Sequence, residues 1–521
     1  MDSVWREQVK MLLEYQNGTV YLDGVEVVSE NHVCLMAGGD GEYASVPLDD
    51  SRSPDRQYVL IDPLAKKIVI NASWYGEYPL FYFSLHGYCV IANHFQDLHQ
   101  RLVKSKKSIL LDRIAVFESM IFDCILRERT YIQEVKKVIA GKRITIDLVS
   151  GSKEQETTYI LPFDQGTESR SENVLLDEAV DLLRSVVNPL KREQSEILLP
   201  LSGGFDSRLL AALLIEKGLD FNSLVFGPKE GSERFVANRV GKVLGIDVTN
   251  IELCDDFYKT YGDQVTLKTG GLSNHRHCHM YAAMQSSRIH SGVIVHGYLG
   301  GEYAGSGQPS SAEIYHMSAE ESVELFLSTR VYRTGIWSLL NENEKQGILS
   351  DIGMISADNN SVNLPCHLDE YVHNVDRQFA LIANVFAPIS ELASVVRPFA
   401  NREYATFFNN LPYRFRKGRL LFRAAGTVIS PKVFAMGNEE QFYPITSYLG
   451  KIEAAAFGAY KRVVYGCFLA SNGRISLPNP KAIERHRHLL VGPLREQFTQ
   501  SVLDLSRMLD KDLTYLLGVS L

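Results

Sequence analysis

The chain has 521 residues, of which 45% are hydrophobic and 22% charged, and its formal net charge is −8. These values are typical of a globular protein, and the length predicts at least two domains because single cores rarely grow beyond about 300 residues. The acidic balance argues against a nucleic-acid partner. No apolar run reaches the roughly 20 residues that span a bilayer, so no membrane association is expected.

Seven cysteines are scattered along the chain without a CxxC pair. Free thiols in this arrangement indicate a reducing compartment, not a disulfide framework or a zinc ribbon. The opening segment, MDSVWREQVKMLLEY, lacks the hydrophobic core of a signal peptide. We therefore expect a cytoplasmic protein.

Residues 1–162 carry short segments that predict β-strands, and we expect them to form one domain. Turn residues such as Asp23-Gly24 and His86-Gly87 separate the expected partners. The expected strand pairs are 20–22 with 25–28, 58–62 with 67–71, 78–83 with 88–93, and 142–147 with 156–160. The polar stretch 161–173 then predicts a linker.

Residues 163–521 change to an alternation of helices and strands, and form the second expected domain. A helix over 232–244 is expected to begin at Ser232 and to end at Gly245. Strands are expected at 197–201, 221–226, 247–253 and 292–296, with mainly helices beyond residue 310. The predicted fold class is α/β: a β-rich α+β domain, then a doubly wound parallel sheet with a helical C-terminal lobe.

Residues 196–217, EILLPLSGGFDSRLLAALLIEK, carry the most specific signal. An apolar strand leads into Ser202-Gly203-Gly204-Phe205-Asp206-Ser207, and a helical pattern follows as far as Gly218. The glycines let backbone N–H groups approach an anion, the serines add hydroxyl donors, and a helix N-terminus favours negative charge. Asp206 suits such a site if a cation lies between it and the phosphates. The segment predicts a site for a nucleotide pyrophosphate with magnesium.

This loop resembles the SGGxDS pyrophosphate loop of the N-type ATP pyrophosphatases, the family of the asparagine synthetase synthase domain. No GxxxxGK[ST] loop occurs in the chain. The resemblance implies that ATP is cleaved between its α- and β-phosphates, leaving AMP on the substrate. It also implies ATP and Mg²⁺ as the bound nucleotide and metal.

The resemblance to asparagine synthetases extends over nearly the whole chain. Asn71–Tyr82 is similar to the RDxxGxxPLYY signature of the N-terminal-nucleophile (Ntn) glutaminase domain, and 397–425 is similar to the helical PFLD…KxxLR region. The glutaminase nucleophile is a cysteine at residue 2, where this chain has Asp2. Without a thiolate no thioester forms, so the resemblance implies an inactive N-terminal domain, as in β-lactam synthetases and lasso-peptide cyclases.

The resemblance also assigns site residues in the second domain. Asp206 and Glu302 are the implied metal ligands, although Glu302 is the only carboxylate of the second glycine-rich loop, 297–305, and pairing with an arginine is the alternative. The family's catalytic lysine aligns with Asn438 or its neighbours. The nearest basic residue in this chain is Lys432, and Lys451 and Arg423 are the alternatives. The implied nucleotide contacts are Leu201, Ser202, Gly203, Gly204, Asp206, Ser207, Phe226, His296 and Gly297.

The function implied is an ATP-dependent ligase that adenylates a carboxylate and transfers the acyl group to ammonia or an amine. The LSGGFDSR form is similar to homologues of surface-polysaccharide and specialised-metabolite pathways, which favours a sugar-acid or peptide-like carboxylate. Intramolecular amide closure and a non-catalytic synthetase-fold partner protein are the alternatives. A homodimer and a partner protein of the same pathway both remain open.

Three other patterns have more than one interpretation. His275, His277 and His279 fit an acceptor pocket or ordinary packing better than zinc, because three ligands on one extended strand are too far apart for one ion. The basic cluster Arg414, Arg416, Lys417 and Arg419 either faces an anionic substrate or coats a helix. Arg208 is expected to reach a phosphate or the sheet edge.

Overall fold

The computed structural model describes most of the chain between residues 11 and 437. The gaps in this range are 17–18, 23–24, 27–32, 38–42, 47–56, 63, 77, 123, 164–168, 228, 230–231, 254–256, 274, 290–291, 307–316, 333–335, 359–367 and 379–383. Predictions for Asp2, Asn438 and Lys451 therefore lie outside the described residues.

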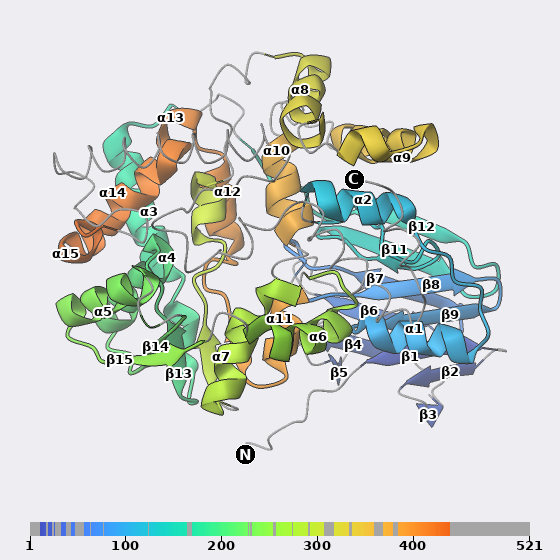
Figure 1. The fold of residues 1–521 in the computed structure, drawn as a ribbon, viewed down its shortest axis with the longest axis horizontal. Coiled ribbons are helices and arrows are strands. Elements are labelled where there is room, and N and C mark those ends of the chain that lie inside the picture. Colours follow the sequence, from blue (N-terminus) through green and yellow to red (C-terminus); the bar gives the residue numbers. More distant parts are fainter. Residues whose placement is uncertain are drawn as a thin grey trace.

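The N-terminal part consists of two antiparallel six-stranded sheets (Figure 1). The first has the order β10-β8-β9-β1-β2-β3, and its strands are β10 (Lys136–Lys137), β8 (Phe81–Leu85), β9 (Tyr88–Ala92), β1 (Leu12–Gln16), β2 (Thr19–Leu22) and β3 (Val25–Glu26). The second has the order β12-β11-β7-β6-β4-β5, and its strands are β12 (Lys153–Thr157), β11 (Lys142–Asp147), β7 (Lys67–Asn71), β6 (Tyr58–Asp62), β4 (Val33–Ala37) and β5 (Tyr43–Val46).

Strand β9 explains how the first sheet is covered on both faces. All of its residues are buried, and successive side chains of a strand point to opposite faces. Cys89 and Ile91 join the core that also contains Ile61, Ile70 and Ile146 of the second sheet. Val90 faces the other core, formed with α1 (Phe95–Lys104) and α2 (Arg113–Phe122). The result is a two-sheet sandwich with helices on one side.

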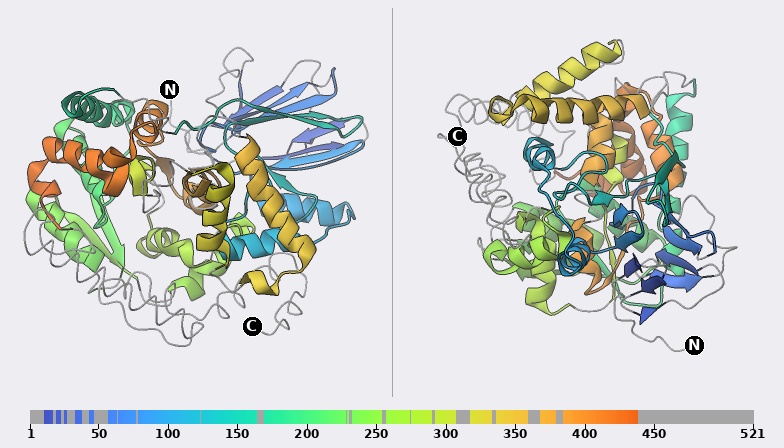
Figure 2. Two further views of the ribbon diagram at one scale, coloured as in Figure 1. Left: turned by 90° about the horizontal axis from the view of Figure 1, so that it is seen from above. Right: turned by 90° about the vertical axis from the view of Figure 1, so that its right-hand side faces the viewer.

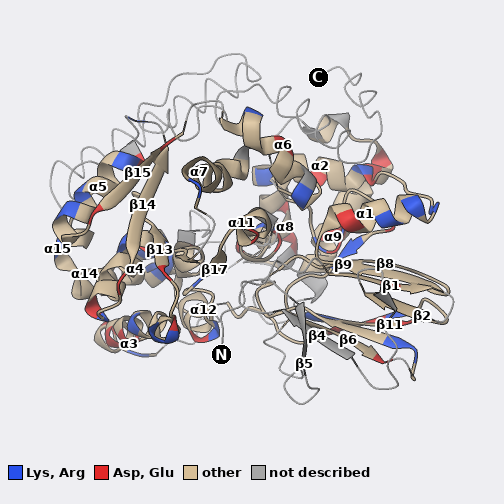
Figure 3. Cartoon of the chain, turned by 90° about the horizontal axis from the view of Figure 1, so that it is seen from below, with Lys and Arg blue, Asp and Glu red and all other residues tan. Residues whose placement is uncertain are grey.

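The second part is built on a five-stranded parallel sheet of order β15-β14-β13-β16-β17. Helices lie on both of its faces, with α3, α4, α5 and α14 on one and α7 and α11 on the other (Figure 3). The strands are β13 (Ile197–Pro200), β14 (Asn222–Gly227), β15 (Val248–Glu252), β16 (Val293–Val295) and β17 (Ser394–Val396). The strand order reverses between β13 and β16, where doubly wound sheets bind their ligands.

The remaining helices follow the same chain order. In the second part, the helices that precede β16 in the chain are α3 (Glu172–Ser185), α4 (Phe205–Glu216), α5 (Ser232–Leu244), α6 (Phe257–Thr269) and α7 (His279–Ser287). Those after β16 are α8 (Ala319–Phe326), α9 (Glu342–Asp358), α10 (Leu368–Tyr371), α11 (Asn384–Ser390), α12 (Arg402–Asn409), α13 (Tyr413–Arg416), α14 (Leu420–Ile429) and α15 (Pro431–Phe434). None of the helices that the structure describes has the length and apolar character needed to cross a bilayer.

Most of the expected strands are confirmed, but some bounds differ, and β1, β4, β5 and β10 were not among the expected strands. The partner of β11 is β12, Lys153–Thr157, not 156–160, because the turn at Gly151 is tighter than expected. Strand β17, Ser394–Val396, was not predicted at all. The mixed α/β class with antiparallel sheets and a parallel sheet is confirmed.

The two parts share an apolar core formed by side chains of α2, α8, α9 and α10. Figure 2 shows the ribbons of these helices from two further sides. Phe122 of α2 stacks on Phe326 of α8, with ring centroids 5.7 Å apart. Two ion pairs also join the parts: Arg113 pairs with Glu344 at 2.6 Å, and Arg129 pairs with Asp351. The first residues of the expected linker also depart from prediction, because Leu161 and Phe163 are buried in the core of the parallel-sheet part.

Candidate functional site

The SGGFDS segment forms the turn between β13 and α4 at the carboxyl edge of the parallel sheet. Gly204 is the N-cap of α4, with an extended backbone and no side chain to cap the first helical N–H groups. These groups point out of the helix N-terminus and favour an anion. The strand–turn–helix arrangement expected for this segment is confirmed.

The two serines of this turn bond within it. Ser207 Oγ accepts from the Ser202 N–H at 3.0 Å and lies 3.0 Å from Ser202 Oγ. Ser202 Oγ accepts from the Gly204 N–H at 3.1 Å. The hydroxyls therefore hold the shape of the unliganded loop, and each would exchange a bond within the loop for one to a phosphate.

The second glycine-rich loop, 297–301, follows β16 and packs directly on the first. A Cβ atom on Gly297 would lie 3.0 Å from the Ser207 nitrogen. On Gly300 and Gly301 it would lie 3.1 and 3.2 Å from the carboxylate oxygens of Asp206. Glycine is thus required by close approach of the two loops. Asp206 is the side chain at which they meet.

Tyr404 of α12 fixes the second loop from behind. Its side chain is completely buried, and its hydroxyl donates a 2.6 Å hydrogen bond to the Gly300 carbonyl. Tyr404 was not among the predicted site residues. The sequence gives little indication of this role, because a tyrosine in an aromatic helical segment, REYATFFN, is typical of core packing.

We expect Tyr404→Phe to destabilise the protein by about 1–2 kcal/mol, because the buried Gly300 carbonyl loses its donor. Nucleotide affinity should fall with it, since Gly300 lies against Asp206. Urea unfolding and nucleotide titration measure the two effects. Tyr332→Phe is the matched control, because Tyr332 is 42% exposed; equal effects in both variants would contradict this role for Tyr404.

Glu302 begins a π-helical turn, Glu302–Ser306, that continues from the second loop. Burial, and then the negative charge of Asp206, raises the pKa of Glu302 to about 7. Its Oε2 atom is buried and has no hydrogen-bond partner among the described residues. Two carboxyl groups that repel each other at a loop junction are suited to share a cation.

Arg419 supplies a positive charge at the same place. Its Nη1 atom lies 3.8 Å from Asp206 Oδ1 and would be 2.7 Å from a Cβ atom on Gly301. Its charge also favours the ionised form of Glu302. The ion pair of Arg419 is with Asp206, so whether Glu302 takes a metal or an arginine as its partner stays a prediction.

The pair of carboxylates fits magnesium when water or phosphate oxygens complete its coordination. Mg²⁺ is commonly held by one or two protein carboxylates together with substrate phosphates and water. Asp206 and Glu302 would be those ligands. In the described part of the chain no group of three or more His, Cys, Asp or Glu side chains is placed to hold a metal.

Arg208 does not face the phosphate position, which corrects the expectation for this residue. It is completely buried, and its guanidinium donates to five backbone carbonyls. The acceptors are Gly203, Gly204, Val433, Met436 and Gly437. Arg208 therefore ties the first glycine-rich loop to α15 and to Met436 and Gly437, which follow α15.

The two candidate lysine substitutes differ in position. Lys432 is exposed on α15 and makes no ion pair with a described residue. Arg423 of α14 is half-buried, and its guanidinium lies 5.4 Å from the ring of Phe205 in the first loop. Arg419 and Arg423 both lie 5.4 Å from the ring of Phe205, and the role expected of Lys432 stays a prediction.

The basic cluster 414–419 has no single role. Arg416 is completely buried and pairs with Glu370, which is equally buried. Arg414 covers the ring of Phe415, and Lys417 is exposed on the surface. Only Arg419 of the four contacts an expected site residue in the part of the chain that is described.

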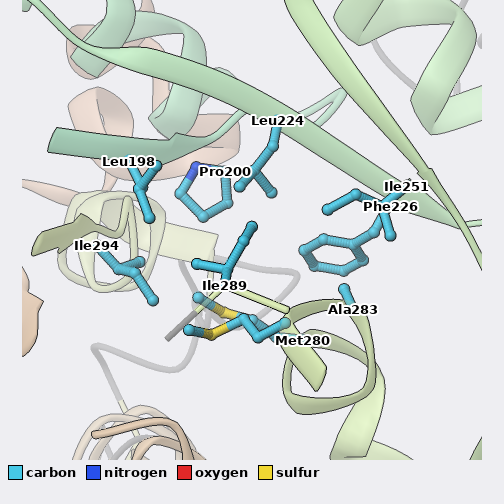
Figure 4. A pocket seen from close by; sticks show the side chains of 10 residues that line it. Leu198, Pro200, Leu224, Phe226, Ile251, Met280, Ala283, Ile289 and Ile294 are labelled. Carbon is cyan, nitrogen blue, oxygen red and sulfur yellow. The ribbon is translucent and has the colours of Figure 1, made fainter. Parts of the chain in front are cut away.

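A narrow apolar pocket opens between the parallel sheet and α7 (Figure 4). Phe226 at the end of β14 points into it, and Pro200 lines it next to Leu201. Its other walls are Leu198, Leu224, Ile251, Met280, Ala283, Met284, Ile289 and Ile294. Leu201 itself is 1% exposed, so Phe226 is the more accessible of the two expected base contacts.

His296, at the carboxyl end of β16, is neutral at physiological pH. Burial, and then the charge of Arg397, lowers its pKa to about 4. Its Nδ1 atom accepts a hydrogen bond from the Tyr298 N–H at 3.2 Å, which leaves the proton on Nε2. The ring is therefore a fixed donor beside the second loop.

The histidines at 275–279 lie on a short 3₁₀ turn and the start of α7, not on an extended segment. His279 is exposed, with its ring 5.7 Å from Phe226. The side chain of His275 lies outside the described residues, so the expectation against zinc stays a prediction.

No protein-family model matches this chain, and no curated protein matches it significantly. Fold and site geometry are therefore the basis for a functional assignment.

Proposed function

We propose that this protein is an ATP-dependent amide-forming ligase of the asparagine synthetase type. In this proposal residues 163–521 are the ATP pyrophosphatase domain and residues 1–162 are an inactive, Ntn-like domain. One observation carries it: at the reversal of strand order, two glycine-rich loops converge on Asp206, beside the uncapped N-terminus of α4.

The nucleotide would bind across this edge of the sheet. The backbone N–H groups of 203–207 and the hydroxyls of Ser202 and Ser207 suit the β- and γ-phosphates. Gly297 lets the second loop approach the first closely, so that both loops would line the polyphosphate. The adenine would lie toward Phe226, which lines an apolar pocket, and toward Leu201, which follows Pro200 of the same pocket wall. His296, at the end of β16, would be a donor for the nucleotide.

The reaction has two steps. A carboxylate oxygen of the substrate attacks the α-phosphorus of ATP, the bond from that phosphorus to the bridging oxygen breaks, and pyrophosphate leaves. An amine or ammonia then attacks the acyl carbon, and AMP departs with the electron pair of the C–O bond. Bound Mg²⁺ would offset phosphate charge, and Asp206 and Glu302 would hold it.

The positive groups around the first loop support this chemistry. Arg419 and Arg423 flank Phe205 on the side of the phosphates, and both carry charge that favours pyrophosphate as a leaving group. Arg423 takes the part that was expected of Lys432.

The product nucleotide tests the proposal. Purified protein, ATP, Mg²⁺ and ammonium are combined with a panel of sugar acids and of peptides that carry both a carboxylate and an amine. AMP and pyrophosphate should form in equal amounts and only with a suitable carboxylate. ADP as the product would refute the proposal, and glutamine in place of ammonium should give no amide because residue 2 is Asp2.

A non-catalytic partner protein is the second candidate, favoured by Arg419 at the carboxylates and by the exposure of Lys432. It predicts nucleotide binding without AMP formation for every member of the panel. The same experiment therefore separates the two.

A further inference from the structure

The turn that carries Arg419 is unusual in its backbone. Gly418 and Arg419 both have positive φ, +60° and +58°. Glycine adopts this conformation freely, but an arginine does so at a cost, and such outliers concentrate at functional sites. The turn directs the arginine back over Gly301 and Phe205, toward Asp206.

Neighbouring contacts hold this turn in place. Arg416, just before it, is anchored by its buried ion pair with Glu370. The backbone of Arg416 also packs on Gly305, where a Cβ atom would be only 2.4 Å from the Arg416 carbonyl oxygen. The backbone that carries Arg419 is thus held in place, while 26% of the Arg419 side chain is exposed.

Arg419 lies where a cation bound to Asp206 and Glu302 would have to lie. Its guanidinium lies beside Asp206 and over Gly301, and its charge acts on Glu302. The other two arginines near Phe205 are different. Arg208 is committed to backbone carbonyls, and Arg423 makes no ion pair with a described residue.

We propose that Arg419 is a resident counter-ion, which pairs with Asp206 in the unliganded protein and moves to the polyphosphate when a divalent cation replaces it. The inference rests on the proposed function, because it assumes that Asp206 receives a metal with the nucleotide. Arg419 is a positioning residue: it keeps the two carboxylates compensated before binding, and adds a cation to the phosphates afterwards.

Two binding measurements on the protein without substrate test this exchange, and neither depends on turnover. Arg419→Gln should bind Mn²⁺ alone at least about 5-fold more tightly than the wild type, because the competing cation is gone. The same variant should bind pyrophosphate, with EDTA present, at least about 5-fold more weakly, because the anion loses a partner. Opposite changes in the two affinities are the signature of the exchange.

The controls separate this role from general charge effects. Lys417 is exposed and lies two residues before Arg419. Lys417→Gln therefore removes one positive charge close by, and it should leave both affinities nearly unchanged. Arg419→Lys should behave much as the wild type. Arg419→Met repeats the test with a second neutral side chain. In Asp206→Asn, metal-free pyrophosphate should bind more tightly, and this gain should vanish when Arg419→Gln is added.

The proposal is overturned if Arg419→Gln leaves Mn²⁺ affinity unchanged, or alters it no more than Lys417→Gln does. Failure of the protein to bind Mn²⁺ in any variant would also overturn it. Absence of AMP formation would instead count against the proposed function, so the two results are distinguishable.

Discussion

Asp206→Asn should lower the rate of AMP and pyrophosphate formation by about 100- to 1000-fold, the scale on which loss of one charge-stabilising group acts in preorganised sites. The amide keeps the size of the side chain but loses the charge that holds a cation between the two loops. Stability should change little, because the loss of the ion pair with Arg419 is offset by relief of the repulsion between Asp206 and Glu302. Activity and stability should therefore separate.

Product quantification and urea unfolding on the same preparation measure both effects. Asp220→Asn is the matched control, since Asp220 lies exposed just beyond the other end of α4, and it should keep full activity. A variant of Asp206 that retains more than about a tenth of the rate would remove this carboxylate from the mechanism.

Arg208→Met should cost about 3 kcal/mol or more of unfolding free energy, because hydrogen bonds of a charged donor are worth about 1.5–3 kcal/mol each and several buried carbonyls would lose theirs. The acceptors belong to the first glycine-rich loop, to α15 and to the residues just after α15. Nucleotide affinity should fall as well, since Gly203 and Gly204 would no longer be held in place.

Arg239→Met provides the comparison for Arg208→Met. Arg239 lies exposed on α5, a helix with several Lys and Arg positions, drawn in blue in Figure 3. Its replacement should change stability by less than about 0.5 kcal/mol. Chemical denaturation and nucleotide titration apply to both variants. If Arg208→Met were as stable as the control, the clamp described for Arg208 would be wrong.

The sequence was sufficient for the elements whose signal is local. The apolar run before Ser202, the glycine turn and the helical stripe after it lie within a single stretch, so the strand, loop and helix at 197–216 were predictable. Strand β17 was not, because three residues, Ser394–Val396, are too few to show a period. Its pairing with β16 depends on distant residues.

The residues that complete the site escaped prediction for a different reason. Tyr404 and Arg419 reach the loops only through packing of the helices that follow β17 and through a left-handed turn. Arg208 looked like a phosphate ligand because it follows the loop in sequence. On the helix, however, its side chain turns back to the carbonyl of Gly204, four residues earlier, and away from the anion position.

The core that α2 shares with α8, α9 and α10 limits which parts of the chain can be removed. Deletion of residues 1–162 would strip a wall of apolar side chains, including Phe117 and Phe122, from α8, α9 and α10. The apolar surface uncovered there would cost roughly 25 cal/mol for each Å² exposed to water. The N-terminal part is therefore scaffolding for the helices of the second part, whatever chemistry either part performs.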